Sequence, residues 1–446
     1  MMKLFPSILI ACLWMVNQSN AQQSPVQMTL AQAQEYAMKN AFQIKSSGYD
    51  AIIAKLNTDA LLGLGMPQVQ ASLQYNNYIN LPTSLVPAQF FGGAPGEYAK
   101  VRFGVPQNMS VGISATQLLF SGTWLVGIEA SKAYAAFQQQ NIKRSEVQVR
   151  EMVASAYQIA QLSHENVRLL QESRTVTQKL LEDTRLMNVN GFVESQDAEQ
   201  LELALNNIQI KINEAEQQVD VAHDVLKFSM GMPIETELVL LDPIQAMLDD
   251  TSLELLSSPI DIEANVDVTL AREGLLLRNI AVKAEKSRFL PTAALFYNLQ
   301  TQAQRDQFDF WDTKQPWFPI QLWGVQVSAP IFSGFTTQKN LEIAKVQVQQ
   351  TTDLLNYTRE AKKLEYAKSA QEFKTAYETM QASKSSLELS NRILEKTRIK
   401  YNEGISTSFE ITQLQRQAIE AQGQYVRAMF QVLNARIAML KILNKI

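Results

Sequence analysis

Few residues in this chain have side chains suited to catalysis or metal binding. The 446 residues include two histidines and one cysteine. His164 and His223 lie far apart in sequence inside helical segments, and neither belongs to an HExxH motif. We interpret both as ordinary helix residues and not as metal ligands. The sequence has no glycine-rich phosphate loop, nucleophile elbow or local triad signature. It therefore predicts no catalytic, cofactor-binding or metal site, and it argues against an enzyme.

The single cysteine lies in a predicted export signal. Residues 1–21 combine an early lysine, an apolar run and the small residues Ser19 and Ala21, which is typical of a secretory signal peptide. The segment ending at Cys12 also fits a lipoprotein motif, so lipidation stays open. If cleavage follows Ala21, the mature chain begins at Gln22 with no cysteine, and therefore with no disulfide or zinc–thiolate site.

Overall charge gives no indication of a nucleic-acid partner. The chain has 40 basic and 44 acidic residues, and its formal net charge is -4. A nucleic-acid-binding surface needs a basic excess, which is missing. No segment after the signal has the run of about eighteen apolar residues that a membrane helix requires. If the chain crosses a bilayer, it must therefore do so with strands.

The chain contains a duplicated architecture. Phe332-Ser333-Gly334 follows Phe120-Ser121-Gly122 by 212 residues, and Gly404 follows Gly191 by 213. A period this long indicates two halves of one architecture, not a solenoid repeat. Without a flexible linker to divide it, the mature chain is predicted to be a single elongated unit. The expected segments are the unit at 22–446, the two repeats at about 28–230 and 264–446, and an intervening mixed segment at about 231–263.

Each repeat is predicted to contain one unusually long helix. The segments 122–190 and 334–403 have no proline, and about 67 helical residues would measure roughly 100 Å. Helices this long expose an apolar face unless antiparallel partners cover it. Shorter helical segments of similar total length supply these partners, and together they predict a hollow cylinder of helices. The shorter segments are 29–62, 193–230, 269–289 and 408–443.

Four segments have the alternation expected of strands. Each has about 10 to 14 residues, which exceeds the usual soluble strand and suits a tilted membrane crossing. The same alternation is typical of an antiparallel sheet on a soluble core, but the length and the aromatic residues in the connecting segments favour an outer-membrane barrel. The four segments are 68–79, 107–120, 292–302 and 321–332.

Four strands cannot close a barrel, so the chain must oligomerise. A membrane-spanning sheet with an open edge leaves backbone groups without hydrogen-bond partners in hydrocarbon. Two copies would give about eight strands with little lumen, and three would give about twelve with room for a pore. The strand arithmetic therefore favours a trimer. The predicted fold is mixed and mainly α: a long antiparallel α-helical barrel continuous with a transmembrane β-barrel, four strands per chain, closed by trimerisation.

Taken together, these features resemble the TolC-type outer-membrane factors. The resemblance is carried by the signal peptide, the paired strands, the Phe-Ser-Gly helix starts, the segment Arg398-Ile399-Lys400-Tyr401-Asn402-Glu403-Gly404-Ile405-Ser406, and Met28-Thr29-Leu30 echoed by Val268-Thr269-Leu270. It implies a homotrimer in outer-membrane lipid with a long periplasmic extension. Its implied partners are a periplasmic adaptor and, through the adaptor, an inner-membrane pump. It implies no cofactor and no nucleic acid, and the function is a passive exit duct.

In this family the helix turns at the end of each hairpin form the periplasmic entrance and bind the adaptor. Here these turns are 188–195, the first turn, and 401–408, the second turn. For the two glycines, a left-handed residue that ends a helix is the simpler interpretation. For the two arginines, a solvated helix face is an equally good one. The residues implied as adaptor contacts are Arg185, Asn190, Gly191, Phe192, Arg398, Tyr401, Gly404, Ile405 and Ser406.

Acidic residues near the turns are candidates for the lining of the entrance. Glu410 matches an acidic entrance position of the family, and Asp197 occupies the equivalent place in the first repeat. Glu403 is a further candidate, and Gln413 replaces a second acidic residue. Three or six carboxylates around an axis would favour cations. Residues 407–410 also form a capping-box pattern, in which Glu410 would serve its own helix start.

Two questions stay open at this level. A periplasmic coiled-coil structural or scaffold protein without a pore is the alternative that the long helices alone permit. The transported substrate, and the choice between a tripartite efflux system and type I secretion, cannot be read from the sequence, because in this family the pump and adaptor select the cargo.

Overall fold

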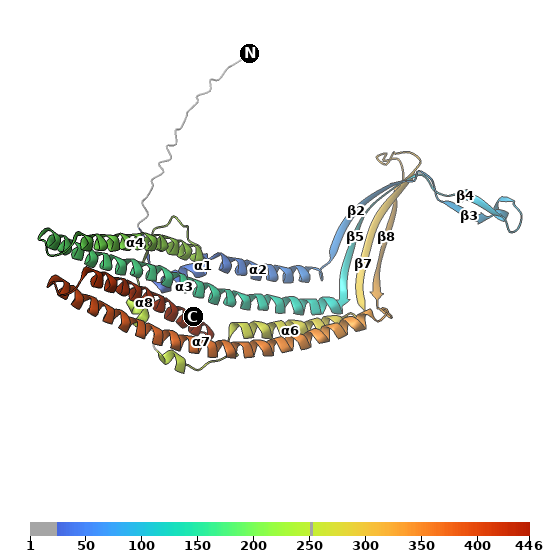
Figure 1. Cartoon of the computed structure of the whole chain (residues 1–446). Coiled ribbons are helices and arrows are strands. Elements are labelled where there is room, and N and C mark those ends of the chain that lie inside the picture. The colour runs from blue at the N-terminus through green and yellow to red at the C-terminus, as the bar shows by residue number, and fades with distance from the viewer. Residues whose placement is uncertain (1–24, 250–252) are drawn as a thin grey trace, which may run out of the picture. The chain divides into compact units, whose positions relative to one another are not determined.

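The computed structural model describes residues 25–249 and 253–446. The predicted signal peptide, its cleavage site and Cys12 lie outside these residues. The described chain is mainly helical with four long strands, as the predicted fold class requires (Figure 1). It divides into two compact units, and each takes segments from both halves of the sequence. These units cut across the two expected repeats, so we describe each unit by itself, and the division into repeats stays a prediction.

The first unit combines Met1–Ala41, Val149–Leu253 and Lys374–Ile437. Its helices include the C-terminal parts of two helices of nearly 70 residues, which also contribute residues to the second unit. Its two short strands, β1 and β6, pair in parallel. The elements are β1 (Val26–Met28), α1 (Leu30–Asn40), α3 (Gly122–Val189), α4 (Ser195–Met230), β6 (Leu238–Leu240), α5 (Ile244–Asp249), α7 (Thr336–Asn402) and α8 (Ser408–Ile442).

A buried tyrosine joins the β1–β6 pair to α3. The Tyr157 hydroxyl donates a hydrogen bond to the Met28 carbonyl (3.1 Å) and accepts one from the Asp242 backbone N–H (3.2 Å). Asp242 in turn accepts a hydrogen bond from the Leu30 N–H at the start of α1 (2.6 Å). Burial raises the pKa of Tyr157, so its hydroxyl keeps its proton. Strands of three residues have too few positions to show a period in the sequence, and they were not predicted.

The first helical segment is interrupted where the sequence predicts one run over 29–62. Helix α1 ends at Asn40, and Ala41 has an extended backbone with φ -58° and ψ 134°. The end of α4 lies close to this break. Gly231 has φ +71°, and a Cβ built on it would lie 2.5 Å from the Asn40 carbonyl oxygen. Only glycine fits this position, because it must be left-handed and must also approach another backbone.

The second unit combines Phe42–Gln148, Glu254–Phe373 and Ala438–Ile446. It holds a four-stranded antiparallel sheet in the order β2-β5-β7-β8 (Figure 1). Its elements, besides the remaining parts of α3 and α7, are α2 (Phe42–Gly63), β2 (Gln68–Asn77), β3 (Thr83–Pro87), η1 (Ala88–Phe91), β4 (Tyr98–Arg102), β5 (Gln107–Ser121), η2 (Leu253–Ser257), α6 (Val266–Ser287), β7 (Thr292–Arg305) and β8 (Phe318–Ser328).

One face of this sheet is apolar and exposed. The register places Leu73 opposite Val111, Ile113 opposite Leu299, and Tyr297 opposite Trp323, so these side chains share a face. All six are exposed. The other face carries mainly glutamine, serine and glycine residues from the alternate positions. An apolar face in contact with solvent is the pattern of a sheet that contacts lipid on one side and water on the other. None of the described helices combines the length and apolar character needed to cross a membrane.

The two Phe-Ser-Gly sites have different local structures. In the first repeat β5 ends at Ser121 and α3 begins at Gly122. In the second, β8 ends at Ser328 and α7 begins only at Thr336, whereas the sequence predicts a strand to residue 332 and a helix from 334. Pro330 has no N–H and cannot continue the strand ladder. Gly334 and Phe335 then adopt φ values of 59° and 63°. The second site is therefore a longer connection.

The connection between β2 and β5 contains an additional hairpin. Its proline and glycine content suggests only a loop, but β3 and β4 pair there in an antiparallel register from Thr83 with Arg102 to Pro87 with Tyr98. The loop between β3 and β4 is longer than an ordinary hairpin loop, because it contains η1 and a turn. Pro87 ends β3, a position in which proline is tolerated. Because proline is rare inside strands, the composition of this segment suggests a loop and not a hairpin.

Candidate functional site

The two turns predicted as the entrance end their long helices in the same way. Gly191 and Gly404 are left-handed, with φ +77° and +75°. After each glycine the backbone N–H bonds back to the helix, from Phe192 to the Met187 carbonyl (3.0 Å) and from Ile405 to the Lys400 carbonyl (2.8 Å). This is the Schellman arrangement, for which glycine is the preferred residue. The structural interpretation of both glycines is therefore correct.

Polar contacts within the first turn connect α3 to α4. Arg185 on α3 donates a hydrogen bond to Glu202 on α4 (2.8 Å), and both side chains are about half exposed. Asp197 accepts a hydrogen bond from the Glu194 backbone N–H (3.2 Å) and so caps the start of α4. Asn190 donates to the Leu186 carbonyl (2.7 Å). Arg185 and Asp197 thus stabilise the same hairpin from two sides.

The equivalent residues of the second turn bond locally. Arg398 pairs with Glu395 on its own helix (2.8 Å). Thr407 accepts a hydrogen bond from the Glu410 backbone N–H (3.3 Å), which is half of the expected capping box. The other half is missing, because the Glu410 carboxylate accepts from the Ser406 hydroxyl (2.6 Å). Glu410 therefore stabilises the turn before α8. The bond back to the N-cap N–H, which the capping-box pattern predicts, does not form.

Two hydrogen bonds join the first turn to the second. The Ser408 hydroxyl at the start of α8 donates to the Asp197 carboxylate, and the Thr184 and Tyr401 hydroxyls lie 3.0 Å apart. Thr184 and Tyr401 are 0% and 2% exposed. Burial raises the pKa of Tyr401. The surrounding apolar cluster, which the four helices share, consists of Leu180, Leu181, Leu201, Leu394, Ile411 and Ala418.

Residues of both turns line a cavity of about 800 Å³. It brings together seven of the residues predicted from the sequence, four from the second turn and three from the first repeat. Arg185, Gly191, Arg398, Ile405, Glu410 and Gln413 do not line it. Arg398 lines a neighbouring cavity with Glu395, and Gln413 accepts a hydrogen bond from Arg416. The predicted residues in the cavity are Asn190, Phe192, Asp197, Tyr401, Glu403, Gly404 and Ser406.

Large apolar side chains are exposed at both turns. Phe192 is 80% exposed in the first turn, and Ile405 is 71% exposed in the second. Phe409, next to the second turn, is also exposed. Tyr401, predicted to be a contact residue as well, is buried and therefore has a structural role in the isolated chain. Exposed aromatic and branched side chains at the end of a hairpin are the residue types that a partner's apolar surface can cover.

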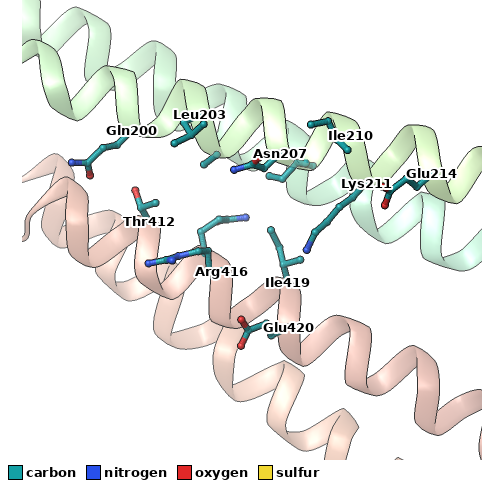
Figure 2. A pocket seen from close by; sticks show the side chains of 13 residues that line it. Gln200, Leu203, Asn207, Ile210, Lys211, Glu214, Thr412, Arg416, Ile419 and Glu420 are labelled. Atoms are coloured by element: carbon teal, nitrogen blue, oxygen red, sulfur yellow. The ribbon is translucent and has the colours of Figure 1, made fainter.

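A groove between α4 and α8 was missed by the sequence reasoning. It measures about 470 Å³, and side chains from both helices surround it (Figure 2). Charged side chains of both signs line it: Lys211 and Glu214 from α4, and Arg416 and Glu420 from α8. Its floor is partly apolar because Leu203 and Ile419 contribute. The signal was available: Gln200, Leu203, Asn207, Lys211 and Glu214 recur every three or four residues and so share one helix face.

The two histidines are not isolated from each other, contrary to what their sequence separation suggests. His164 on α3 and His223 on α4 place their Nε2 atoms 2.8 Å apart. Burial lowers the pKa of both imidazoles. No set of three or more His, Cys, Asp or Glu side chains in residues 25–249 and 253–446 is arranged to hold a metal ion.

Comparison with known proteins identifies the architecture. Residues 262–445 match the family described as "Outer membrane efflux protein". No curated protein sequence matches the chain. Among solved structures, the chain is similar to CusC, with a TM-score of 0.72, 15% identity, and coverage of 94% of this chain and 92% of that one. For the CmeC outer membrane channel of Campylobacter jejuni the values are 0.69, 15%, 93% and 85%. For VceC of Vibrio cholerae they are 0.67, 13%, 93% and 95%.

The fold is thus that of the outer-membrane channels, with a helical region joined to a strand region. Together with the sequence match over residues 262–445, this fold makes the chain similar to the outer membrane efflux proteins, the TolC-type outer-membrane factors. Both comparisons support a passive exit duct of the cell outer membrane with a periplasmic extension. Neither comparison supports the alternative of a coiled-coil scaffold without a pore.

Proposed function

We propose that three copies of this chain form the duct, with twelve strands closing the membrane barrel. The support comes from the sheet itself. Within the part of the chain that the structure describes, β2 and β8 are its edge strands, and each has one side without a strand partner. An edge of ten or eleven residues in hydrocarbon needs a partner for every backbone group. Pairing β8 of one copy with β2 of the next satisfies both edges and encloses a lumen.

The two helix turns form the periplasmic entrance and the adaptor-binding surface in this proposal. Two observations support it together: hydrogen bonds join the two turns, and large apolar side chains at both turns are exposed. Asp197, Ser408, Thr184 and Tyr401 join the turns, while Phe192 and Ile405 remain exposed. An adaptor hairpin that covers these apolar side chains would continue along the α4–α8 groove, whose charges of both signs favour a polar helix face. The adaptor connects the duct to an inner-membrane pump.

Glu403 and Glu410 supply the negative charge of the entrance. Both side chains are exposed, whereas the Asp197 carboxylate is held by Ser408 and the Glu194 N–H. Gln413 contributes no charge and accepts from Arg416. In a trimer the two glutamates give six carboxylates around the axis, which favour cations over anions. Asp197 then contributes to the entrance mainly by positioning α8.

Adaptor binding is tested by photo-crosslinking. A benzoyl-phenylalanine placed at Phe192, at Ile405 or at Leu203 in the groove should give an adduct with the cognate adaptor in intact cells. Phe228 is a matched control, because it is an equally exposed aromatic on the last turn of α4. Adducts from Phe228 but none from the two turns would place the adaptor elsewhere.

The duct is tested separately by conductance in planar bilayers. Purified protein should migrate as a heat-modifiable oligomer and form cation-preferring channels. The double variant Glu403→Gln/Glu410→Gln should reduce that preference, and Glu35→Gln should not, because Glu35 is an exposed residue of α1 paired with Lys39. A preference that persists in the double variant contradicts the acidic entrance, and recovery of the protein without detergent contradicts the duct.

A further inference from the structure

The two histidines of the chain form a pair. They are the only two among 446 residues, and α3 and α4 place them in direct contact although 59 positions separate them. Their Nε2 atoms are 2.8 Å apart, and their ring planes are nearly perpendicular, at 85°. The proposed entrance makes no use of this pair, since neither histidine lines the cavity at the two turns or the α4–α8 groove.

The surroundings leave the pair accessible from one side. His164 is exposed and His223 is half-buried. His164 lines a cavity of about 390 Å³ together with Glu165 and Arg168, so solvent and small ions reach its ring. Among the neighbouring charges, Glu165 pairs with Arg168 (2.6 Å) and Asp224 with Lys227 (2.8 Å), and Asp220 also acts on His223. In this pair one Nε2 donates a hydrogen bond and the other accepts it. A metal ion can bind both Nε2 atoms only by replacing this hydrogen bond, with the proton of the donor ring moved to Nδ1.

We propose that His164 and His223 form a two-imidazole site for a divalent transition-metal ion of the Cu²⁺, Ni²⁺ or Zn²⁺ type. Imidazole nitrogen binds these ions at about 2.0–2.1 Å, so two adjacent ligands of one ion lie about 2.9 Å apart at a right angle and about 3.3 Å apart in a tetrahedron. The observed 2.8 Å lies close to the first value. To bind one ion, both rings must turn until their Nε2 lone pairs point at it, and His164 is exposed to solvent.

The donor set also indicates which ions bind. Two neutral imidazoles suit the transition metals, whereas Ca²⁺ and Mg²⁺ prefer oxygen ligands. With two protein ligands, water completes the coordination. Because one ligand belongs to α3 and the other to α4, a bound ion joins the two helices and stabilises their contact in the folded state.

Electron paramagnetic resonance with Cu²⁺ tests the site directly. The full chain is prepared in detergent with a tag that contains no histidine, so every imidazole signal comes from this pair. We expect a spectrum with hyperfine splitting from two imidazole nitrogens at one ion per chain, and calorimetry should give binding at least tenfold weaker in His164→Gln and in His223→Gln. Zn²⁺ should raise the melting temperature of the unaltered protein by a few degrees and leave both variants unchanged.

The control is Arg168→Gln, which alters the same cavity and keeps both imidazoles. It should bind Cu²⁺ at least as tightly as the unaltered protein, because a nearby positive charge is removed. A spectrum with one nitrogen or none, or equal Cu²⁺ affinity in the histidine variants, overturns the proposal and identifies the pair as a hydrogen bond only. Since His164 is exposed, His164→Gln keeps the test valid even if His223→Gln fails to fold.

Discussion

The two helix turns have the same backbone conformation but differ in their side-chain hydrogen bonds. Gly191 and Gly404 have the same left-handed conformation and the same return hydrogen bonds. The first turn is bonded across its own hairpin through Arg185 and Glu202. In the second turn the equivalent Arg398 pairs within its own helix. The first hairpin is thus held by its own contacts, and the second depends on Asp197 and Thr184 of the first.

This difference indicates which part of the proposed entrance can move. Duplication has kept the glycine turn, because a left-handed residue is needed wherever a long helix must reverse. It has not kept the polar contacts, so the two turns are held with unequal strength. Separation of the second turn from the first breaks two side-chain hydrogen bonds and exposes part of the apolar cluster that the four helices share, but it breaks no ion pair between described residues. We therefore expect the second turn to move when the entrance opens.

The largest effect should come from Asp197. In Asp197→Ala the start of α4 loses its cap and Ser408 loses its acceptor, so the free energy of unfolding should fall by about 2 kcal/mol. In Glu410→Ala only an exposed local bond is lost, and the fall should be below about 0.5 kcal/mol. Urea titration in detergent measures both. Equal losses would show that the two acidic residues have the same role and that the comparison is wrong.

The glycine turns should respond equally. Gly191→Ala and Gly404→Ala each force a Cβ into a left-handed backbone, at a cost of about 1–2 kcal/mol. A Cβ at either position meets no atom within 4 Å, so strain is the only contribution. The same titration serves, with Gly274→Ala as the control because Gly274 lies inside α6 in open space. Unequal losses at the two turns would reveal a difference in the backbone as well.

Tyr401→Phe isolates the second link between the turns. The ring remains in the buried cluster, and only the hydroxyl contact with Thr184 is lost, so the expected cost is about 1 kcal/mol. Single-channel recording should show more frequent opening, since one of the two bonds that hold the second turn is gone. Thr184→Val removes the same bond from the other side and should match it. Unchanged gating in both variants would restrict the contact to stability.

The smallest effect should come from the arginines. Arg185→Gln removes a contact between two helices, whereas Arg398→Gln removes one within a helix. The first pair is about half exposed, and in the second Arg398 is 27% exposed. Each costs about 0.2–1 kcal/mol, with the larger loss at Arg185. High salt should reduce the difference between either variant and the unaltered protein. A larger loss at Arg398 would indicate that it has a partner in the assembled duct.

The long helices and the glycine turns could be predicted because local rules determine them. The absence of proline allows α3 to continue from Gly122, and Gly191 marks where it ends. The four strands show a clear period because one face is apolar and the other polar. The second Phe-Ser-Gly site was harder, since Pro330 ends the strand early although the motif is the same as the first.

Contacts between distant residues could not be predicted. Asp197 and Ser408 are 211 positions apart, and His164 and His223 are 59 apart, so their contacts depend on how the helices pack. The α4–α8 groove combines two helix faces in the same way. Sequence patterns define which residues share a face of one helix, but they do not define which face of another helix lies opposite. The candidate residues were therefore found more readily than their partners.

The open edges of the sheet have a genetic consequence. In the proposed trimer β2 and β8 pair with neighbouring copies, so a single chain cannot complete the barrel alone. A variant that spoils one edge therefore damages every assembly that it enters. If normal and defective chains are made in equal amounts and mix at random into trimers, only about one eighth of the assemblies contain three normal chains. A single altered copy expressed beside the normal one should thus act as a dominant inhibitor of export.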